Sequence, residues 1–105
     1  MAFKISKEIT PQKVAAQLKK GESLIMLDVR ELGEWAEGHI AGAQHIPLGQ
    51  LLERQHELDP SQETIVICRS GNRSGLACEL LDEKGFNVVN MTGGLNAWTD
   101  ELVRD

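Results

Sequence analysis

Short apolar runs alternate along this chain with segments of helical periodicity. The three clearest runs, at residues 24–29, 64–68 and 88–91, have the length of strands and are dominated by Ile, Leu and Val. A briefer run lies at residues 43–46. Strands that alternate with helices are joined by right-handed crossovers. The pattern therefore predicts an α/β fold with a mostly parallel sheet flanked by helices.

The helices are predicted from apolar spacing and from the residues that begin and end them. Thr10 and Pro11 are typical of an N-cap and a first helical position, and Gly21 is typical of a helix end. We expect further helices at residues 31–37, 48–55 and 74–84. Leu95, Trp98 and Leu102 share one helical face, so a final helix is expected after residue 94.

Length and charge limit the classes of function. A chain of 105 residues can build one core, so residues 1–105 are predicted to form a single domain. The net charge of −5 argues against nucleic acid or an anionic membrane as a partner, because both require a basic face. No apolar stretch approaches the roughly 18 residues of a membrane-spanning helix.

The two cysteines, Cys68 and Cys78, are too few for a disulfide framework and lack C-x-x-C spacing. Free thiols suit a reducing compartment, and the N-terminus has no apolar run of the signal-peptide type. Cytoplasm is therefore the expected location. His39, His45 and His56 lack the spacing of metal ligands, so no metal site is expected.

The loop after the run at 64–68 carries the most distinctive chemistry. Cys68 ends a predicted strand, and ligands of parallel sheets bind at such carboxyl ends. Inward-facing N–H groups of the loop, the following helix N-terminus and two arginines all favour a thiolate. We therefore predict that the pKa of Cys68 lies below its ordinary value. The predicted substrate-binding residues are Arg69, Ser70, Gly71, Asn72, Arg73 and Ser74.

Individual loop residues have predicted roles. Gly71 suits a positive φ angle or a close approach of the backbone to a bound atom. The hydroxyl groups of Ser70 and Ser74 could donate hydrogen bonds to sulfur, and Ser74 could also cap the helix. Asp28, near the carboxyl end of a neighbouring strand, is expected either to pair with a loop arginine or to form a structural ion pair elsewhere.

With these features in place, the chain resembles the rhodanese-type sulfurtransferases in their stand-alone, single-domain form. The resemblance is carried by Leu27-Asp28-Val29-Arg30, Glu34-Trp35, Gly38-His39-Ile40-Ala41-Gly42-Ala43, His45-Ile46-Pro47, the loop from Cys68 to Ser74, and Gly93-Gly94-Leu95-Asn96-Ala97-Trp98. It implies a five-stranded parallel sheet. It also implies that Cys68 is the sulfur-accepting nucleophile and that residues 69–73 surround the transferred sulfur.

The resemblance implies a ping-pong reaction with no cofactor. The Cys68 thiolate would take the outer sulfur of a small anionic donor such as thiosulfate and form a persulfide. A thiol, cyanide or a partner protein would then accept that sulfur. Because the nucleophile is already anionic, no general base is expected, and the sequence offers no obvious histidine partner for Cys68.

Other interpretations remain open at this stage. A phosphatase or arsenate reductase would use a related cysteine loop, but dual-specificity phosphatases have one residue more between cysteine and arginine than the four that separate Cys68 from Arg73. A persulfide relay between proteins, or a binding module, is a further alternative. Cys78 could resolve an oxidised Cys68, although packing within its helix is the simpler expectation.

Overall fold

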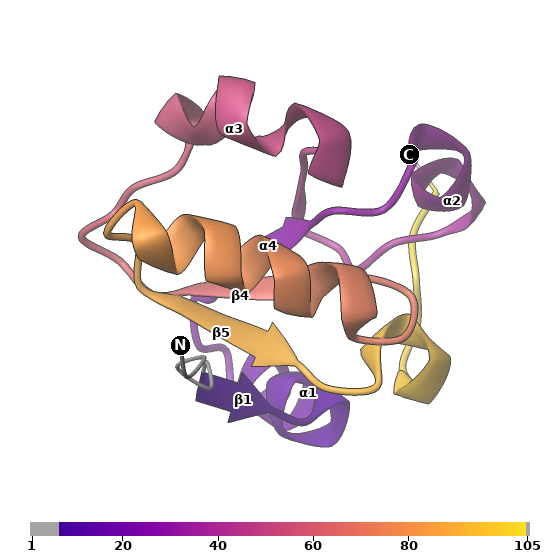
Figure 1. Cartoon of the computed structure of the whole chain (residues 1–105). Coiled ribbons are helices and arrows are strands. Elements are labelled where there is room, and N and C mark those ends of the chain that lie inside the picture. Colours follow the sequence, from indigo (N-terminus) through magenta and orange to yellow (C-terminus); the bar gives the residue numbers. More distant parts are fainter. Residues whose placement is uncertain (1–6, 105) are drawn as a thin grey trace.

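The computed structural model describes residues 7–104, and its centre is one sheet of five parallel strands. The spatial order is β1-β5-β4-β2-β3, so the strand that precedes the cysteine loop lies in the middle (Figure 1). The strands are β1 (Lys7–Ile9), β2 (Ile25–Asp28), β3 (Gln44–His45), β4 (Thr64–Ile67) and β5 (Val88–Met91). The parallel α/β architecture predicted from the alternating pattern is confirmed.

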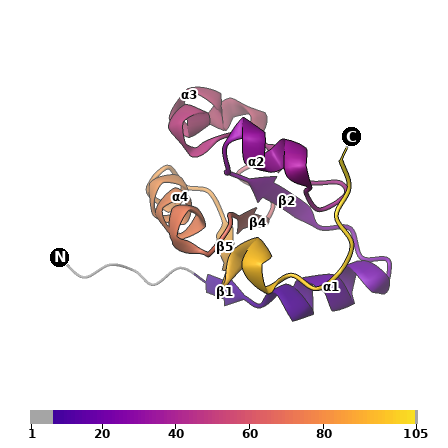
Figure 2. The same cartoon turned by 90° about the vertical axis from the view of Figure 1, so that its right-hand side faces the viewer.

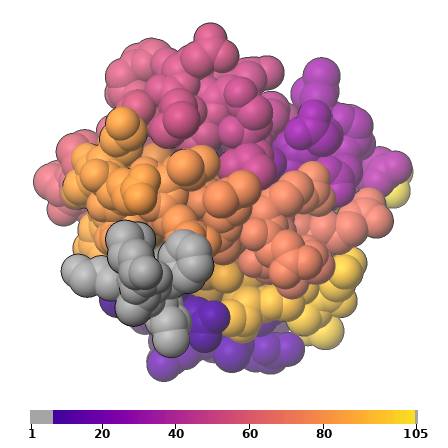
Figure 3. All heavy atoms as spheres, viewed as in Figure 1, coloured from indigo at the N-terminus to yellow at the C-terminus, as the bar shows by residue number. Residues whose placement is uncertain are grey.

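Helices cover both faces of this sheet, as the rotated view in Figure 2 shows. One buried cluster joins the sheet to α3 and α4, and a second joins its other face to α1. In Figure 3 the magenta surface that includes α3 adjoins the orange surface that includes α4. The helices are α1 (Pro11–Lys19), α2 (Leu32–Glu37), α3 (Leu51–Arg54) and α4 (Asn72–Glu83), with 3₁₀ helices η1 (Leu48–Gln50), η2 (Gln55–Glu57) and η3 (Gly94–Ala97).

Strand β4 is buried because its side chains pack into both clusters. In β4, Val66 packs toward α4, whereas Ile65 and Ile67 pack toward α1. Every residue of β4 is buried, which explains its unbroken apolar run. At the start of α1 the Thr10 hydroxyl accepts the N–H of Lys13 at 3.2 Å, as an N-cap should. Within residues 7–104, no helix has the length and apolar character needed to cross a bilayer.

Two elements differ from the sequence-based expectation. The edge strand β1 was not predicted from the residue pattern, because its residues Lys7 and Glu8 are exposed and charged. The predicted final helix is only the short 3₁₀ helix η3, which ends at Ala97, and its predicted extension to Leu102 is wrong because Trp98 is already extended. Val103 instead exchanges two backbone hydrogen bonds with His39, at 2.9 and 2.8 Å. This long-range pairing replaces the helical hydrogen bonds.

The turn at Gly93 and Gly94 packs against the backbone of the cysteine loop. The N–H of Leu95 donates to the carbonyl of Cys68, and that of Asn96 donates to the carbonyl of Arg69, both at 2.9 Å. Gly94 has φ +57°, and a Cβ there would lie 2.5 Å from backbone atoms of Cys68 and Arg69. Only glycine permits this close approach.

We therefore expect Gly94→Ala to lower the free energy of unfolding by about 2 kcal/mol or more, because two backbone segments must separate. Gly33→Ala is the matched control, since a Cβ at that helical position meets nothing within 4 Å. It should change stability by no more than about 1 kcal/mol, toward stabilisation. Urea unfolding of both variants provides the comparison, and equal stability of Gly94→Ala and wild type would contradict this packing.

Candidate active site

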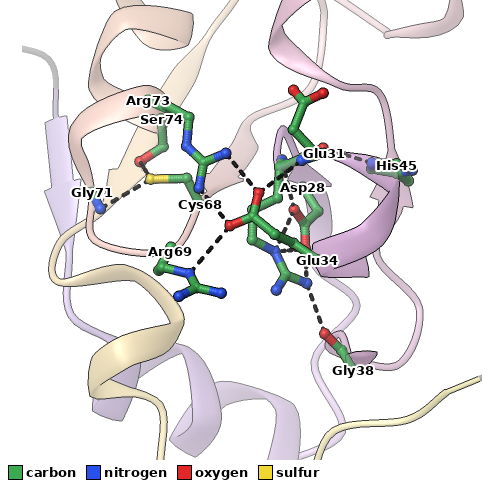
Figure 4. Close-up of polar contacts among 11 residues, drawn as sticks. Asp28, Glu31, Glu34, Gly38, His45, Cys68, Arg69, Gly71, Arg73 and Ser74 are labelled. Atoms are coloured by element: carbon green, nitrogen blue, oxygen red, sulfur yellow. Dashed lines mark hydrogen bonds and ion pairs between the residues drawn. The ribbon is translucent and has the colours of Figure 1, made fainter. Parts of the chain in front are cut away.

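The site lies at the carboxyl end of the central strands, where the chain leaves β4 and turns into α4. Cys68 directly follows β4, and Gly71 immediately precedes α4 with φ +102°. This conformation is in the left-handed region that the sequence analysis anticipated for Gly71. The loop therefore turns back within three residues and brings the backbone nitrogen of Gly71 to the cysteine sulfur (Figure 4).

Two groups of the loop contact the sulfur of Cys68. The N–H of Gly71 donates to Sγ at 3.0 Å, and the Ser74 hydroxyl lies 3.3 Å from Sγ. The side chain has no exposed surface in this arrangement. Sγ is thus held by polar groups of its own loop, and a reagent can reach it only if the residues that cover it move.

These contacts govern the ionisation of the thiol. Burial by itself raises the pKa of Cys68, but hydrogen bonds from the Ser74 hydroxyl and from the backbone N–H groups of Ser74, Gly71 and Ser70 outweigh it. The net effect lowers the pKa of Cys68 below its ordinary value, in the direction that the sequence predicts. The neutral donors of the loop, led by Ser74, thus stabilise the thiolate.

Asn90, on β5, joins Ser74 to the loop. The Ser74 hydroxyl donates to Asn90 Oδ1 at 2.5 Å, and Asn90 Nδ2 donates to the carbonyl of Gly71 at 3.3 Å. A hydroxyl has a single hydrogen, so while it is given to Asn90, the contact with Sγ must be donated by the thiol. The Ser74 hydroxyl can therefore stabilise the thiolate only if its hydrogen turns from Asn90 to the sulfur.

The two loop arginines share one carboxylate, that of Glu34 on α2. Arg73 Nη1 and Nη2 donate to Glu34 Oε1 and Oε2 at 2.7 and 2.8 Å, and Arg69 Nε donates to Oε2 at 3.2 Å. Figure 4 shows Glu34 reaching both arginine side chains beside Cys68. The hydrogen bond from Arg73 is the main cause that lowers the pKa of Glu34 to about 2.

Local contacts fix α2, and with it Glu34. Glu31 and Glu34 form a capping box, in which Glu34 Oε1 also accepts the N–H of Glu31 at 3.0 Å. The adjacent Trp35 ring stacks on His39 and His45, with centroids 3.5 and 4.8 Å apart. Glu34 is therefore presented to the arginines from a helix anchored on its other side.

A family model described as the rhodanese-like domain matches residues 10–101 of the chain. The chain belongs to the rhodanese-like domain family.

Relatives of this rhodanese-like domain include proteins named for sulfur chemistry. It is 44% identical over 95 residues to "Putative sulfurtransferase YtwF" of Bacillus subtilis, with 90% of this chain and 92% of that protein covered. It is 42% identical over 93 residues to "Putative sulfur carrier protein YrkF" of the same organism, covering 88% of this chain and half (50%) of that protein. A solved rhodanese-like domain protein from Staphylococcus aureus superposes with a TM-score of 0.90 at 30% identity, covering 94% of this chain and 98% of that one.

The expected pairing of Asp28 with a loop arginine is wrong, and the alternative of a structural ion pair holds. In this rhodanese-like domain Asp28 binds Arg30, whose Nη2 lies 2.8 Å from Oδ2. The same Nη2 donates to the carbonyl of Gly38 at 2.8 Å, and both side chains are buried. The Asp28 carboxylate is thus paired with a residue only two positions away, and Glu34 is the partner of the two loop arginines.

The other candidate residues have defined positions. Ser74 lies in the first turn of α4 and does not cap it, because Gly71 is the N-cap and Ser74 is directed at Cys68 and Asn90. Asn72 begins α4, and Ser70 contributes its backbone N–H to Cys68. Cys78 is fully buried, and burial is the main cause that raises its pKa to about 12. Within residues 7–104, no three metal-ligating side chains are grouped.

Sequence reasoning missed Glu34 and Asn90 as site residues. Glu34 was visible only as part of a resemblance motif, 35 positions from Arg69 in the chain. Asn90 interrupts an apolar run, which was a signal, since a polar side chain in a buried strand needs a hydrogen-bonding partner.

We expect Ser74→Ala to raise the pKa of Cys68, because it removes the hydroxyl that contributes most to thiolate stabilisation. Ser70→Ala is the matched control, since Ser70 acts through its retained backbone N–H. A pH titration of thiolate ultraviolet absorbance, corrected with Cys68→Ala, measures each pKa. If Ser70→Ala and Ser74→Ala shift the pKa of Cys68 equally, the assignment is wrong.

Proposed function

We propose that this rhodanese-like domain transfers sulfane sulfur, with the sulfur carried as a persulfide on Cys68. The observation that carries this proposal is the loop geometry, in which the sulfur at the end of β4 accepts the N–H of Gly71 and lies beside the Ser74 hydroxyl. The same donors can stabilise the negative charge of a persulfide. Relatives named as a sulfurtransferase and a sulfur carrier protein support the same chemistry.

The reaction has two steps. The Cys68 thiolate attacks the outer sulfur of thiosulfate or a related donor, and the S–S bond of thiosulfate breaks with its electron pair leaving on sulfite. The outer sulfur of the resulting persulfide is then attacked by cyanide, a thiol or a cysteine of a partner protein. That step gives thiocyanate or a new persulfide and returns Cys68 as a thiolate.

The lowered pKa of Cys68 supports this mechanism without a general base. The thiolate is the nucleophile in the first step and the leaving group in the second. Hydrogen bonds that stabilise it therefore increase the ionised fraction of Cys68 before the first step and make it a better leaving group in the second. The buried position of Sγ adds a requirement. Donor binding must be accompanied by a displacement of loop or rim side chains that opens a path to the sulfur.

We also propose that residues 1–105 act as one domain in the cytoplasm. The match across residues 10–101 and the two core clusters on opposite faces of one sheet support the single domain. Two unpaired thiols are consistent with a reducing compartment. The proposed partners are a small sulfur donor and a thiol or protein acceptor.

Incubation with thiosulfate should add one sulfur atom to the protein, detected by intact-protein mass spectrometry and localised to Cys68 by peptide mapping. Cys68→Ser should gain nothing, because it lacks the nucleophile. Cys78→Ser is the control and should gain the sulfur like the wild type, since the Cys78 thiol stays protonated and buried. Sulfur found on Cys78, or none on either cysteine with any donor, would reject the proposal.

A phosphatase or arsenate reductase is the less favoured alternative, after a persulfide relay between proteins or a binding module. Four residues separate Cys68 from Arg73, and the guanidinium of Arg73 is bound to Glu34. Hydrolysis of a small aryl phosphate that is lost in Cys68→Ser would favour this class over sulfur transfer.

A further inference from the structure

The carboxylate of Glu34 fills the guanidinium site that a small anion would be expected to use. Its two oxygens accept four hydrogen bonds, two from Arg73, one from Arg69 and one from the N–H of Glu31. The bidentate contact with Arg73 is the geometry with which arginine binds a sulfonate or carboxylate ligand. A sulfonate that used the same face of Arg73 would have to displace Glu34.

The formal charges around Cys68 also disfavour the binding of a small dianion. Arg69 and Arg73 supply two positive charges, and Glu34 with the Cys68 thiolate supplies two negative charges. The cluster is therefore electrically balanced whenever Cys68 is ionised. A dianion such as thiosulfate meets no net positive field from these four groups, although the arginine content of the loop alone would suggest one.

The carboxylate is also held in place. Glu34 is mostly buried, with 19% of its side chain exposed, and α2 is fixed by its capping box and by the stacking of Trp35. Because the pKa of Glu34 is lowered to about 2, the competing charge persists at all physiological pH values. The internal anion is thus a permanent part of the site.

We propose that Glu34 is a specificity-determining residue that competes with the sulfonate end of dianionic donors for Arg73 and Arg69. The site then favours thiol persulfides, which have no oxyanion group. In that reaction the Cys68 thiolate attacks the outer sulfur, the S–S bond of the donor breaks, and the donor thiolate leaves with the electron pair. This inference rests on the proposed sulfur-transfer function. It assigns the donor class that the loop arginines alone would not indicate.

Binding is tested in a Cys68→Ala background, in which thiosulfate cannot react. Adding Glu34→Gln should lower the Kd for thiosulfate, measured by isothermal titration calorimetry at fixed ionic strength, at least about fivefold. Gln retains an oxygen for the capping box, so α2 should remain folded, and thermal unfolding checks this. An unchanged or higher Kd in a folded Glu34→Gln protein overturns the proposal.

Glu31→Gln is the matched control for charge. It removes one negative charge from the same helix start. Among the salt bridges of residues 7–104 Glu31 makes no ion pair with a loop arginine, and its charge acts on Arg73 only at longer range. Its effect on the thiosulfate Kd should be less than half that of Glu34→Gln on a logarithmic scale. Equal effects would mean that general charge, and not competition at the arginines, controls binding.

Selectivity is tested with Cys68 intact, by measuring the rate of persulfide formation from thiosulfate and from cysteamine persulfide, which carries no oxyanion. Glu34→Gln should raise the rate with sub-saturating thiosulfate about fivefold or more relative to the rate with cysteamine persulfide. An unchanged ratio overturns the selectivity. If neither donor loads Cys68 while the Kd still changes, the sulfur-transfer proposal fails and the competition of Glu34 stands.

Discussion

The contact between the sulfur of Cys68 and the N–H groups of its own loop is the interaction on which the rest of this site depends. It exists because β4 ends at Ile67 and Gly71 adopts a left-handed conformation that turns the loop back on the sulfur. The loop in turn rests on Gly94, where no side chain would fit. A central buried strand, a tight turn and a glycine support thus combine to place donors around one atom. Burial would otherwise favour the neutral thiol.

Two polar groups from other elements complete the site and act on different parts of it. Asn90 on β5 accepts the hydrogen of Ser74 and so couples the hydroxyl orientation to the ionisation of Cys68. Glu34 on α2 binds the arginines and balances their charge. The sulfur is stabilised chiefly by neutral hydrogen-bond donors, and Arg73, although bound to the Glu34 carboxylate, also interacts coulombically with Cys68.

The sequence was sufficient for the architecture and for the position of Cys68, because both depend on local patterns. The apolar run at 64–68 defined β4, and the segment from Arg69 to Ser74 identified the loop. It was insufficient where distant residues meet. The partner of Arg73 lies 39 positions away, and the pairing of Val103 with His39 cancelled a helix that local spacing favoured. The sequence correctly placed Asp28 at the carboxyl ends of the strands, but its carboxylate pairs with Arg30 and not with a loop arginine.

We infer that the N–H groups of the loop stabilise negative charge on Sγ of Cys68 and on a second sulfur bonded to it. A crystal structure of the protein after persulfide formation tests it most directly. The outer sulfur should lie within hydrogen-bond distance of the backbone N–H groups of residues 70–74, with the N–H of Gly71 still directed into the loop. An outer sulfur that points into solvent, away from these amides, would contradict the account.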